Sequence, residues 1–138
     1  MKGEYQFNLA NIHEAAAWFW DQIGDGRVIA MHGHMGAGKT SFVHALCDVK
    51  QVKDPVSSPT FSLVNEYLVP GGEKICHIDL YRIKDEEEAI QAGIEDVLYS
   101  GAVCFVEWPE RAPDIFPPGS LEVSLSVNPD QSRTIKLL

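Results

Sequence analysis

Arg27-Val-Ile-Ala-Met-His32, followed directly by Gly33-His34-Met35-Gly36-Ala37-Gly38-Lys39-Thr40, is the stretch of sequence that decides the fold. Its first part is a short, nearly unbroken apolar run, which is typical of a strand covered on both faces in a parallel sheet. A glycine-rich turn comes next, and then a helical stretch, Lys39–Val49. A strand, a glycine loop and a helix in this order form the structural context of a phosphate-binding loop.

The loop matches the pattern G-x-x-x-x-G-K-[ST]. Glycines let the backbone curl so that successive N–H groups point at phosphate oxygens, while the helix N-terminus adds partial positive charge. Lys39 is predicted to reach the β- and γ-phosphates, and the Thr40 hydroxyl to ligate Mg²⁺. An ordinary glycine turn is the alternative, which the flanking strand and helix disfavour. The predicted nucleotide-binding residues of the loop are Gly33, Gly36, Ala37, Gly38, Lys39, Thr40 and Ser41.

Apolar patterns on both sides of the loop predict the remaining elements. An amphipathic helix is expected over Ile12–Ile23, with Asn11 as its N-cap and Gly24 as its stop. The other expected elements are a hairpin of residues 61–69 and 74–80, a Glu-rich helix over 84–92, a central strand over 101–107, and a hairpin of 121–127 and 134–138 at a sheet edge. The sequence therefore predicts one α/β domain over residues 1–138, with a P-loop NTPase-like three-layer fold. Its central sheet is expected to be mostly parallel, with antiparallel edge strands.

Two acidic residues end apolar strands and are candidates for the metal site. A nucleoside triphosphatase needs a carboxylate near Mg²⁺, usually at the end of a strand next to the loop. Glu107 has that position, and a solvent-facing carboxylate at a strand end is the alternative. Asp79 is predicted either to support Mg²⁺ or to orient the attacking water, and capping of a turn is its alternative role.

Two further features follow from position along the chain. The segment Ser57-Ser58-Pro59-Thr60-Phe61 lies after the loop helix, where switch segments of such enzymes occur, and Thr60 is predicted to add a hydroxyl to the metal shell. A simple turn is the alternative. Trp108 directly follows Glu107 and is predicted to contact the nucleotide, with simple packing as the alternative.

Histidine and cysteine are not expected to carry the chemistry. His32, His34 and His77 show no recognisable ligand spacing, and phosphoryl transfer of this kind works through positioning and electrostatics. The three cysteines are Cys47, Cys76 and Cys104, an odd number without a C-x-x-C pair. They are predicted to be buried free thiols.

Composition limits the partners. The net charge is −9, from 20 acidic and 11 basic residues, without a basic tract. Independent nucleic-acid binding is therefore disfavoured, because it draws most of its affinity from phosphate neutralisation. The N-terminal region resembles neither a secretory leader nor a spanning helix, so we expect a cytoplasmic protein with no membrane contact.

Four motifs follow one another along the chain. They are Gly33-x-x-Gly36-Ala37-Gly38-Lys39-Thr40, Ser58-Pro59-Thr60-Phe61-x-Leu63-Val64-x-Glu66-Tyr67, His77-x-Asp79-Leu80-Tyr81-Arg82 and Val106-Glu107-Trp108-Pro109-Glu110. In order, spacing and total length they resemble the TsaE (YjeE) family over residues 5–125. His34-Met35 departs from the family, which commonly has an acidic or polar residue and then Leu. Phosphate binding is expected to survive this change, because the loop backbone holds phosphate.

The resemblance implies a bacterial ATPase that binds ATP and Mg²⁺ and works with the TsaB–TsaD pair. The product is threonylcarbamoyladenosine in the anticodon loop of tRNAs that read codons beginning with adenine. TsaD transfers the threonylcarbamoyl group, and a TsaE-like chain supplies ATP hydrolysis and meets tRNA only through the complex. The residues implied are Lys39, Asp79 and Glu107 for catalysis, Thr40, Thr60 and Glu107 for the metal, and Trp108 beside the nucleotide.

Two other classes of protein use such a loop. A small-molecule kinase needs a lid with several phosphate-clamping arginines, but the chain has four arginines and no lid-sized insertion. A GTP-dependent switch normally carries an Asn-Lys-x-Asp motif, which is absent from the sequence. We hypothesise that ATP turnover is slow in the isolated chain and rises with TsaB–TsaD, with Arg82 as a possible contributor in cis.

Overall fold

The structure is a computed structural model that describes residues 3–34, 36–53 and 63–138. Its strands are β1 (Glu4–Phe7), β2 (Val28–His32), β3 (Val64–Leu68), β4 (Lys74–Asp79), β5 (Val103–Glu107), β6 (Leu121–Val127) and β7 (Arg133–Leu137). Its helices are α1 (Ile12–Ile23), α2 (Lys39–Val49), α3 (Glu86–Gln91) and α4 (Ile94–Leu98), with short 3₁₀ helices η1 (Leu9–Asn11), η2 (Pro109–Arg111) and η3 (Pro113–Ile115).

All seven strands form one sheet in the order β1-β7-β6-β2-β5-β4-β3. The central strands are parallel, since β2 pairs with both β5 and β6, and β4 pairs with β5 in the same direction. The β3–β4 pair, the β6–β7 pair and the β1–β7 pair are antiparallel. The predicted fold class, a mostly parallel central sheet with antiparallel edge strands, is confirmed.

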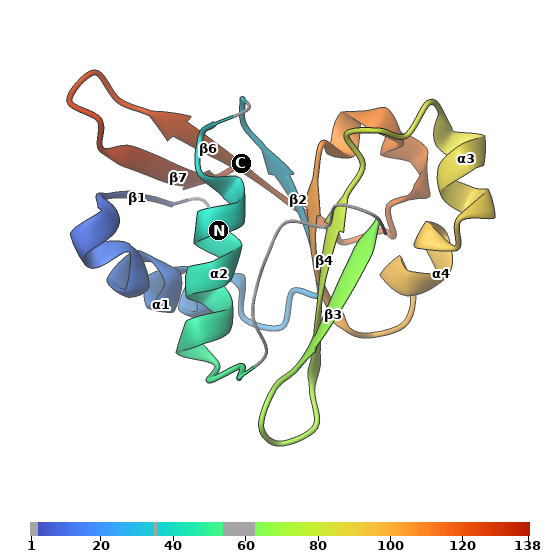
Figure 1. The fold of residues 1–138 in the computed structure, drawn as a ribbon, viewed down its shortest axis with the longest axis horizontal. Coiled ribbons are helices and arrows are strands. Elements are labelled where there is room, and N and C mark those ends of the chain that lie inside the picture. The colour runs from blue at the N-terminus through green and yellow to red at the C-terminus, as the bar shows by residue number, and fades with distance from the viewer. Residues whose placement is uncertain (1–2, 35, 54–62) are drawn as a thin grey trace.

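Helices cover the sheet on both faces, which gives three layers (Figure 1). One core cluster lies under α1 and α2 and is built around buried phenylalanines that include Phe19, Phe42 and Phe105. The other cluster lies under α3 and α4 and includes Ile78 and Val106. Alternate residues of β4 and β5 therefore point into opposite cores, as the two-residue period of a strand requires.

The C-terminal hairpin forms as predicted, but its expected place at the sheet edge was wrong. β6 lies inside the sheet beside β2, and β1 covers the outer side of β7. The alternation of apolar and polar residues in β6 predicted a strand with one covered face, and Val123 and Leu125 are indeed buried. Such an alternation does not indicate which strand lies next to β6. The short strand β1 had not been predicted, and neither had α4.

The ends of α1 differ in how well they were predicted. Gly24 is the C-cap and has a positive φ of 54°, as expected of a helix stop. Asn11 stands at the N-cap position without a side-chain capping bond. Asn8 takes the capping role one turn earlier, and its side-chain oxygen accepts from the backbone N–H groups of Ala10 and Asn11 at the start of η1.

Candidate functional site

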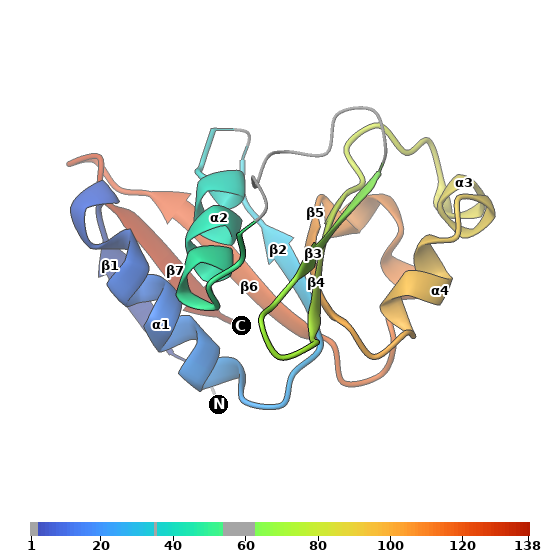
Figure 2. The same ribbon diagram turned by 60° about the horizontal axis from the view of Figure 1, so that its bottom comes forward.

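The glycine-rich loop joins the carboxyl end of β2 to the N-terminus of α2, so it lies at the end of the sheet where the central parallel strands finish (Figure 2). Gly33 is required by close packing, because a Cβ there would stand 2.8 Å from the backbone oxygen of Leu125 on β6. Gly38 has a φ of 96°, which places it in the left-handed region just before α2 begins. The loop shape therefore depends on glycine at these two positions.

Lys39 begins α2 and is held tightly at the loop. Its side chain donates to the Gly33 carbonyl oxygen at 2.6 Å, and Nζ lies 4.0 Å from the centroid of the Trp108 ring. Burial lowers the pKa of Lys39, an effect that the nearby charges of Glu107, Glu110 and Asp79 oppose. The ammonium thus lies among carboxylates and close to the backbone of the loop.

Glu107, the last residue of β5, is buried with 4% of its surface exposed. The alternative of a solvent-facing carboxylate is therefore wrong. Its Oε2 atom accepts a hydrogen bond from the Thr40 hydroxyl at 3.1 Å. A hydroxyl and a carboxylate thus converge at the N-terminus of α2, and hard oxygen ligands of this kind suit Mg²⁺.

Asp79 ends β4 directly beside Glu107, with which it is paired in the parallel register. Its Oδ1 accepts a hydrogen bond from the backbone N–H of Tyr81 at 2.9 Å, so Asp79 does cap the turn, which was the alternative role predicted for it. Burial raises the pKa of Asp79, and the charge of Glu107 adds to the rise. The bond from Tyr81 and the charges of His77 and Lys39 oppose it. Asp79 also lines the cavity at the loop, so capping the turn leaves it available to the site.

The cavity at the loop has a volume of about 480 Å³. Lining residues come from the loop, from α2, from the ends of β4 and β5, and from η1 and β7. They are Leu9, Gly36, Gly38, Lys39, Thr40, Ser41, Asp79, Tyr81, Glu107, Trp108 and Arg133. Gly33 and Ala37 belong to the loop beside it. Thr60 and the rest of its predicted switch segment lie outside the described residues.

Trp108 closes one side of this cavity from an unusual backbone conformation. Its φ is 58°, in the left-handed region, which is rare for a bulky residue and marks local strain. Its ring packs against Tyr81 with the centroids 5.0 Å apart and also faces the Lys39 ammonium. Packing alone therefore does not describe Trp108, since the ring also contacts the lysine of the loop.

Arg133 of β7 is a site residue that the sequence did not reveal. Its Nε donates to the Ala37 carbonyl oxygen at 3.1 Å, and a terminal nitrogen donates to the Gln131 carbonyl oxygen at 2.6 Å. Arg82 is exposed and is not among the described residues that line the cavity. Arg133 is 93 residues beyond the end of the loop motif, so no local pattern could have connected the two.

His77 is the second residue that sequence reasoning missed. It is fully buried, and its Nε2 forms a hydrogen bond with Oε2 of Glu107. Nδ1 has no hydrogen-bond partner in the described part of the chain, and such an orphaned polar atom costs about 1–3 kcal/mol. The pattern His-x-Asp placed His77 and Asp79 on one face of a strand, and this spacing was the available signal.

Cysteines and the other histidines lie outside this arrangement. Cys47, Cys76 and Cys104 are free and buried, as predicted. His32 pairs with the exposed Glu122 at 3.1 Å. Within residues 3–34, 36–53 and 63–138, His, Cys, Asp and Glu side chains form no group of three or more that could hold a metal ion.

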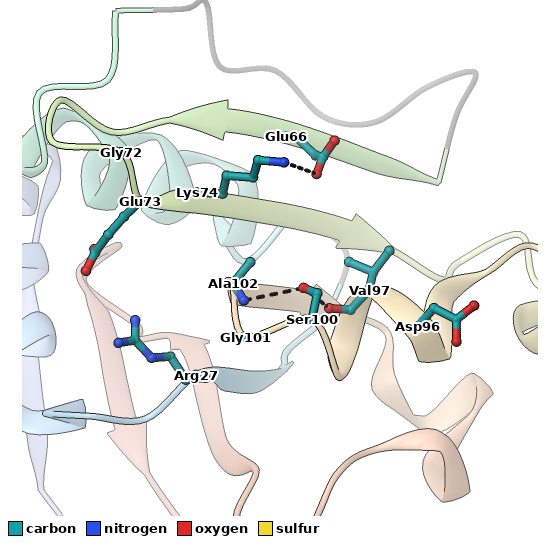
Figure 3. A pocket seen from close by; sticks show the side chains of 10 residues that line it. All are labelled: Arg27, Glu66, Gly72, Glu73, Lys74, Asp96, Val97, Ser100, Gly101 and Ala102. Atoms are coloured by element: carbon teal, nitrogen blue, oxygen red, sulfur yellow. Dashed lines mark hydrogen bonds and ion pairs between the residues drawn. The ribbon is translucent and has the colours of Figure 1, made fainter.

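A second cavity of about 560 Å³ lies near the amino ends of β2, β4 and β5, far from the loop (Figure 3). It is lined by side chains of both charges, including Arg27, Glu73 and Asp96. Lys74 of β4 pairs with Glu66 of the neighbouring strand β3 at 3.8 Å on one side of it. Ligands of open α/β sheets bind outside the carboxyl ends of the parallel strands, so the smaller cavity at the loop is the candidate site.

Comparison with known proteins identifies one family to which the chain is similar. Residues 7–135 match the family described as "Threonylcarbamoyl adenosine biosynthesis protein TsaE". A protein of Haemophilus influenzae named "tRNA threonylcarbamoyladenosine biosynthesis protein TsaE" is 34% identical over 111 residues, 80% of this chain and 69% of that protein. A protein of the same name from Treponema pallidum is 33% identical over 113 residues, 82% of each chain.

A solved structure supports the fold independently. The chain described as "Crystal structure of Bacillus subtilus YdiB" matches with a TM-score of 0.76 and 22% identity, over 99% of this chain and 84% of that chain. None of the described helices is both long enough and apolar enough to cross a membrane.

Asp79→Asn is expected to stabilise the metal-free protein at pH 7 and to lose this effect on acidification. The folded-state pKa of Asp79 is raised, so the folded state disfavours the carboxylate. Below the unfolded pKa both states are protonated, and the penalty appears as the pH rises through the folded pKa. The amide keeps an oxygen that accepts from Tyr81.

Urea unfolding in EDTA at pH 7 and at about pH 4 measures this effect, with Asp25→Asn in an exposed turn as the control. An Asp79→Asn midpoint equal to the wild-type midpoint at pH 7 would contradict the prediction, and so would an equal shift at both pH values.

Proposed function

The chain belongs to the TsaE family of threonylcarbamoyladenosine biosynthesis proteins, and from that premise we propose that it is a Mg²⁺-dependent ATPase acting with TsaB and TsaD. The observation that carries the proposal is the meeting of the Thr40 hydroxyl and the Glu107 carboxylate, 3.1 Å apart, at the start of the helix that Lys39 opens. This arrangement combines a phosphate-binding loop with oxygen ligands for a metal.

Each residue of the proposed site has a role that follows from its chemistry. The loop backbone and Lys39 bind the β- and γ-phosphates of ATP, with Ser41 beside them on α2. Thr40 and Glu107 would hold Mg²⁺, with Thr60 as a further hydroxyl from the segment outside the described residues. When bound, Mg²⁺ supplies charge neutralisation at the phosphates.

Asp79 stands on the strand next to Glu107 and would orient the attacking water or support the metal. Trp108 would contact the nucleotide from the side of Lys39, over which its ring already lies. The residues proposed for the chemistry itself are Lys39, Asp79 and Glu107.

Charge supports an indirect relation to tRNA. With 20 acidic and 11 basic residues the chain has a net charge of −9, which disfavours binding to tRNA phosphates. We therefore propose that TsaB and TsaD provide the tRNA contact, while this chain provides ATP hydrolysis to the assembled complex.

ATP hydrolysis by the isolated chain is expected to be slow and to rise at least about tenfold when TsaB and TsaD are added. Arg133 is the arginine that lines the described cavity, and its guanidinium is already bonded to two backbone carbonyls. The negative charge that develops on the phosphates in the transition state therefore needs hydrogen-bond donors that partner proteins add. Phosphate release with and without the partners measures this. Equal rates would contradict the proposed partnership, and faster turnover of GTP than of ATP would contradict the assignment of ATP.

Lys39→Ala and Glu107→Ala are each expected to reduce ATP hydrolysis at least about a hundredfold, because each removes a charge that acts on the phosphates or the metal. The controls are Lys50→Ala and Glu122→Ala. Lys50 makes a similar contact with the Trp20 ring, at 4.6 Å, and Glu122 is exposed and pairs with His32. If Lys39→Ala or Glu107→Ala retains wild-type turnover in the presence of TsaB–TsaD, the role given to that residue is wrong.

Arg133→Ala is expected to weaken ATP binding about fivefold, or ~1 kcal/mol, because it removes a positive charge beside the loop and the bond to the Ala37 carbonyl. Calorimetric titration with a non-hydrolysable ATP analogue measures the change. Arg82→Ala is the matched control and should leave the affinity of the isolated chain unchanged. If Arg82→Ala weakens binding of the analogue and Arg133→Ala does not, Arg82 and not Arg133 is the arginine that contributes to nucleotide affinity.

A further inference from the structure

The imidazole of His77 and the hydroxyl of Thr40 meet on one oxygen atom of Glu107. Nε2 of His77 bonds to Oε2, and the Thr40 hydroxyl donates to the same Oε2 at 3.1 Å. His77 comes from β4 and Thr40 from α2, so two elements fix the carboxylate at the end of a third, β5. The position of the Glu107 side chain is thus set from both sides.

His77 occupies a position that an apolar residue could fill. It lies on the same face of β4 as Ile75, which belongs to the core under α1 and α2, and it pairs in register with Phe105 of β5. Its Nδ1 atom is buried without a hydrogen-bond partner in the described part of the chain. A buried polar atom without a partner lowers the stability of the folded state. The advantage of histidine at this position therefore lies in the bond that Nε2 makes to Glu107.

We propose that His77 is a positioning residue that holds the Glu107 carboxylate in the orientation needed to bind Mg²⁺. The proposal rests on the proposed function of the site as a Mg²⁺-dependent ATPase. With Glu107 ionised the carboxylate only accepts, so the bond requires that Nε2 of His77 carries the hydrogen. Residues that orient a metal ligand in this way typically contribute 10- to 100-fold to metal affinity.

The test compares His77→Leu, which removes the N–H, with His77→Gln, whose amide can donate. Mg²⁺ is titrated by calorimetry into each protein saturated with a non-hydrolysable ATP analogue, and the analogue is separately titrated in EDTA. His77→Leu should weaken Mg²⁺ binding about tenfold and change binding of the analogue in EDTA by less than about twofold. His77→Gln should recover most of the Mg²⁺ affinity.

Two controls separate positioning from packing. Ile75→Val shortens a buried side chain on the same face of the same strand, so it lowers stability without touching Glu107. Its Mg²⁺ affinity should equal that of the wild type. In a Glu107→Gln background the effect of His77→Leu on Mg²⁺ affinity should vanish, because the partner that His77 orients is changed.

The possible outcomes are distinct. Wild-type Mg²⁺ affinity in His77→Leu overturns the positioning role, and so does an equal loss in His77→Gln and His77→Leu, or a full effect of His77→Leu in the Glu107→Gln background. If His77→Leu does not fold, the comparison of His77→Gln with Ile75→Val decides, and a tenfold loss in His77→Gln overturns the proposal. Failure of the wild type to bind the analogue with Mg²⁺ overturns the proposed function and this inference together.

Discussion

Burial of the Glu107 carboxylate is the constraint on which the arrangement of the site depends. A charge with 4% of its surface exposed is unstable unless hydrogen bonds or opposite charges compensate its loss of water. The compensating groups come from α2 and β4, through the Thr40 hydroxyl and the His77 imidazole. The strand order that brings β4, β5 and β2 side by side is therefore also what makes the buried acid tolerable.

Parallel pairing explains why these groups meet at one edge. Because β2, β4 and β5 run in the same direction, Met31, Asp79 and Glu107 stand in register at the carboxyl ends of the three strands. The turn after β2 then starts a helix directly above Glu107, since Gly33 packs against the backbone of β6 and Gly38 adopts a left-handed φ. The loop and the acidic residues are thus consequences of one topology rather than independent features.

Much of this could be predicted from the sequence, because the informative patterns are local. The apolar run before Gly33, the glycine spacing and the acidic residues that end two strands gave the fold class, the loop and the position of Glu107. Contacts between distant segments could not be predicted. The bond from Arg133 to Ala37 joins residues 96 apart, and the place of β6 between β2 and β7 depends on pairings that alternation does not encode.

His77 shows a different limit of prediction from sequence, because the His-x-Asp pattern was visible but the contact of His77 with Glu107 was not. His77 was predicted not to be a metal ligand because the histidines show no recognisable ligand spacing, and no other role was predicted for it. Its contact is with a carboxylate on the neighbouring strand, which becomes visible once Asp79 and Glu107 are known to be paired in register. Two unfavourable features lie at this end of the strands, namely the left-handed φ of Trp108 and the His77 Nδ1 atom, which has no hydrogen-bond partner among the described residues. Apolar packing dominates the two cores on either side, so both unfavourable features lie beside the residues to which the proposed chemistry is assigned.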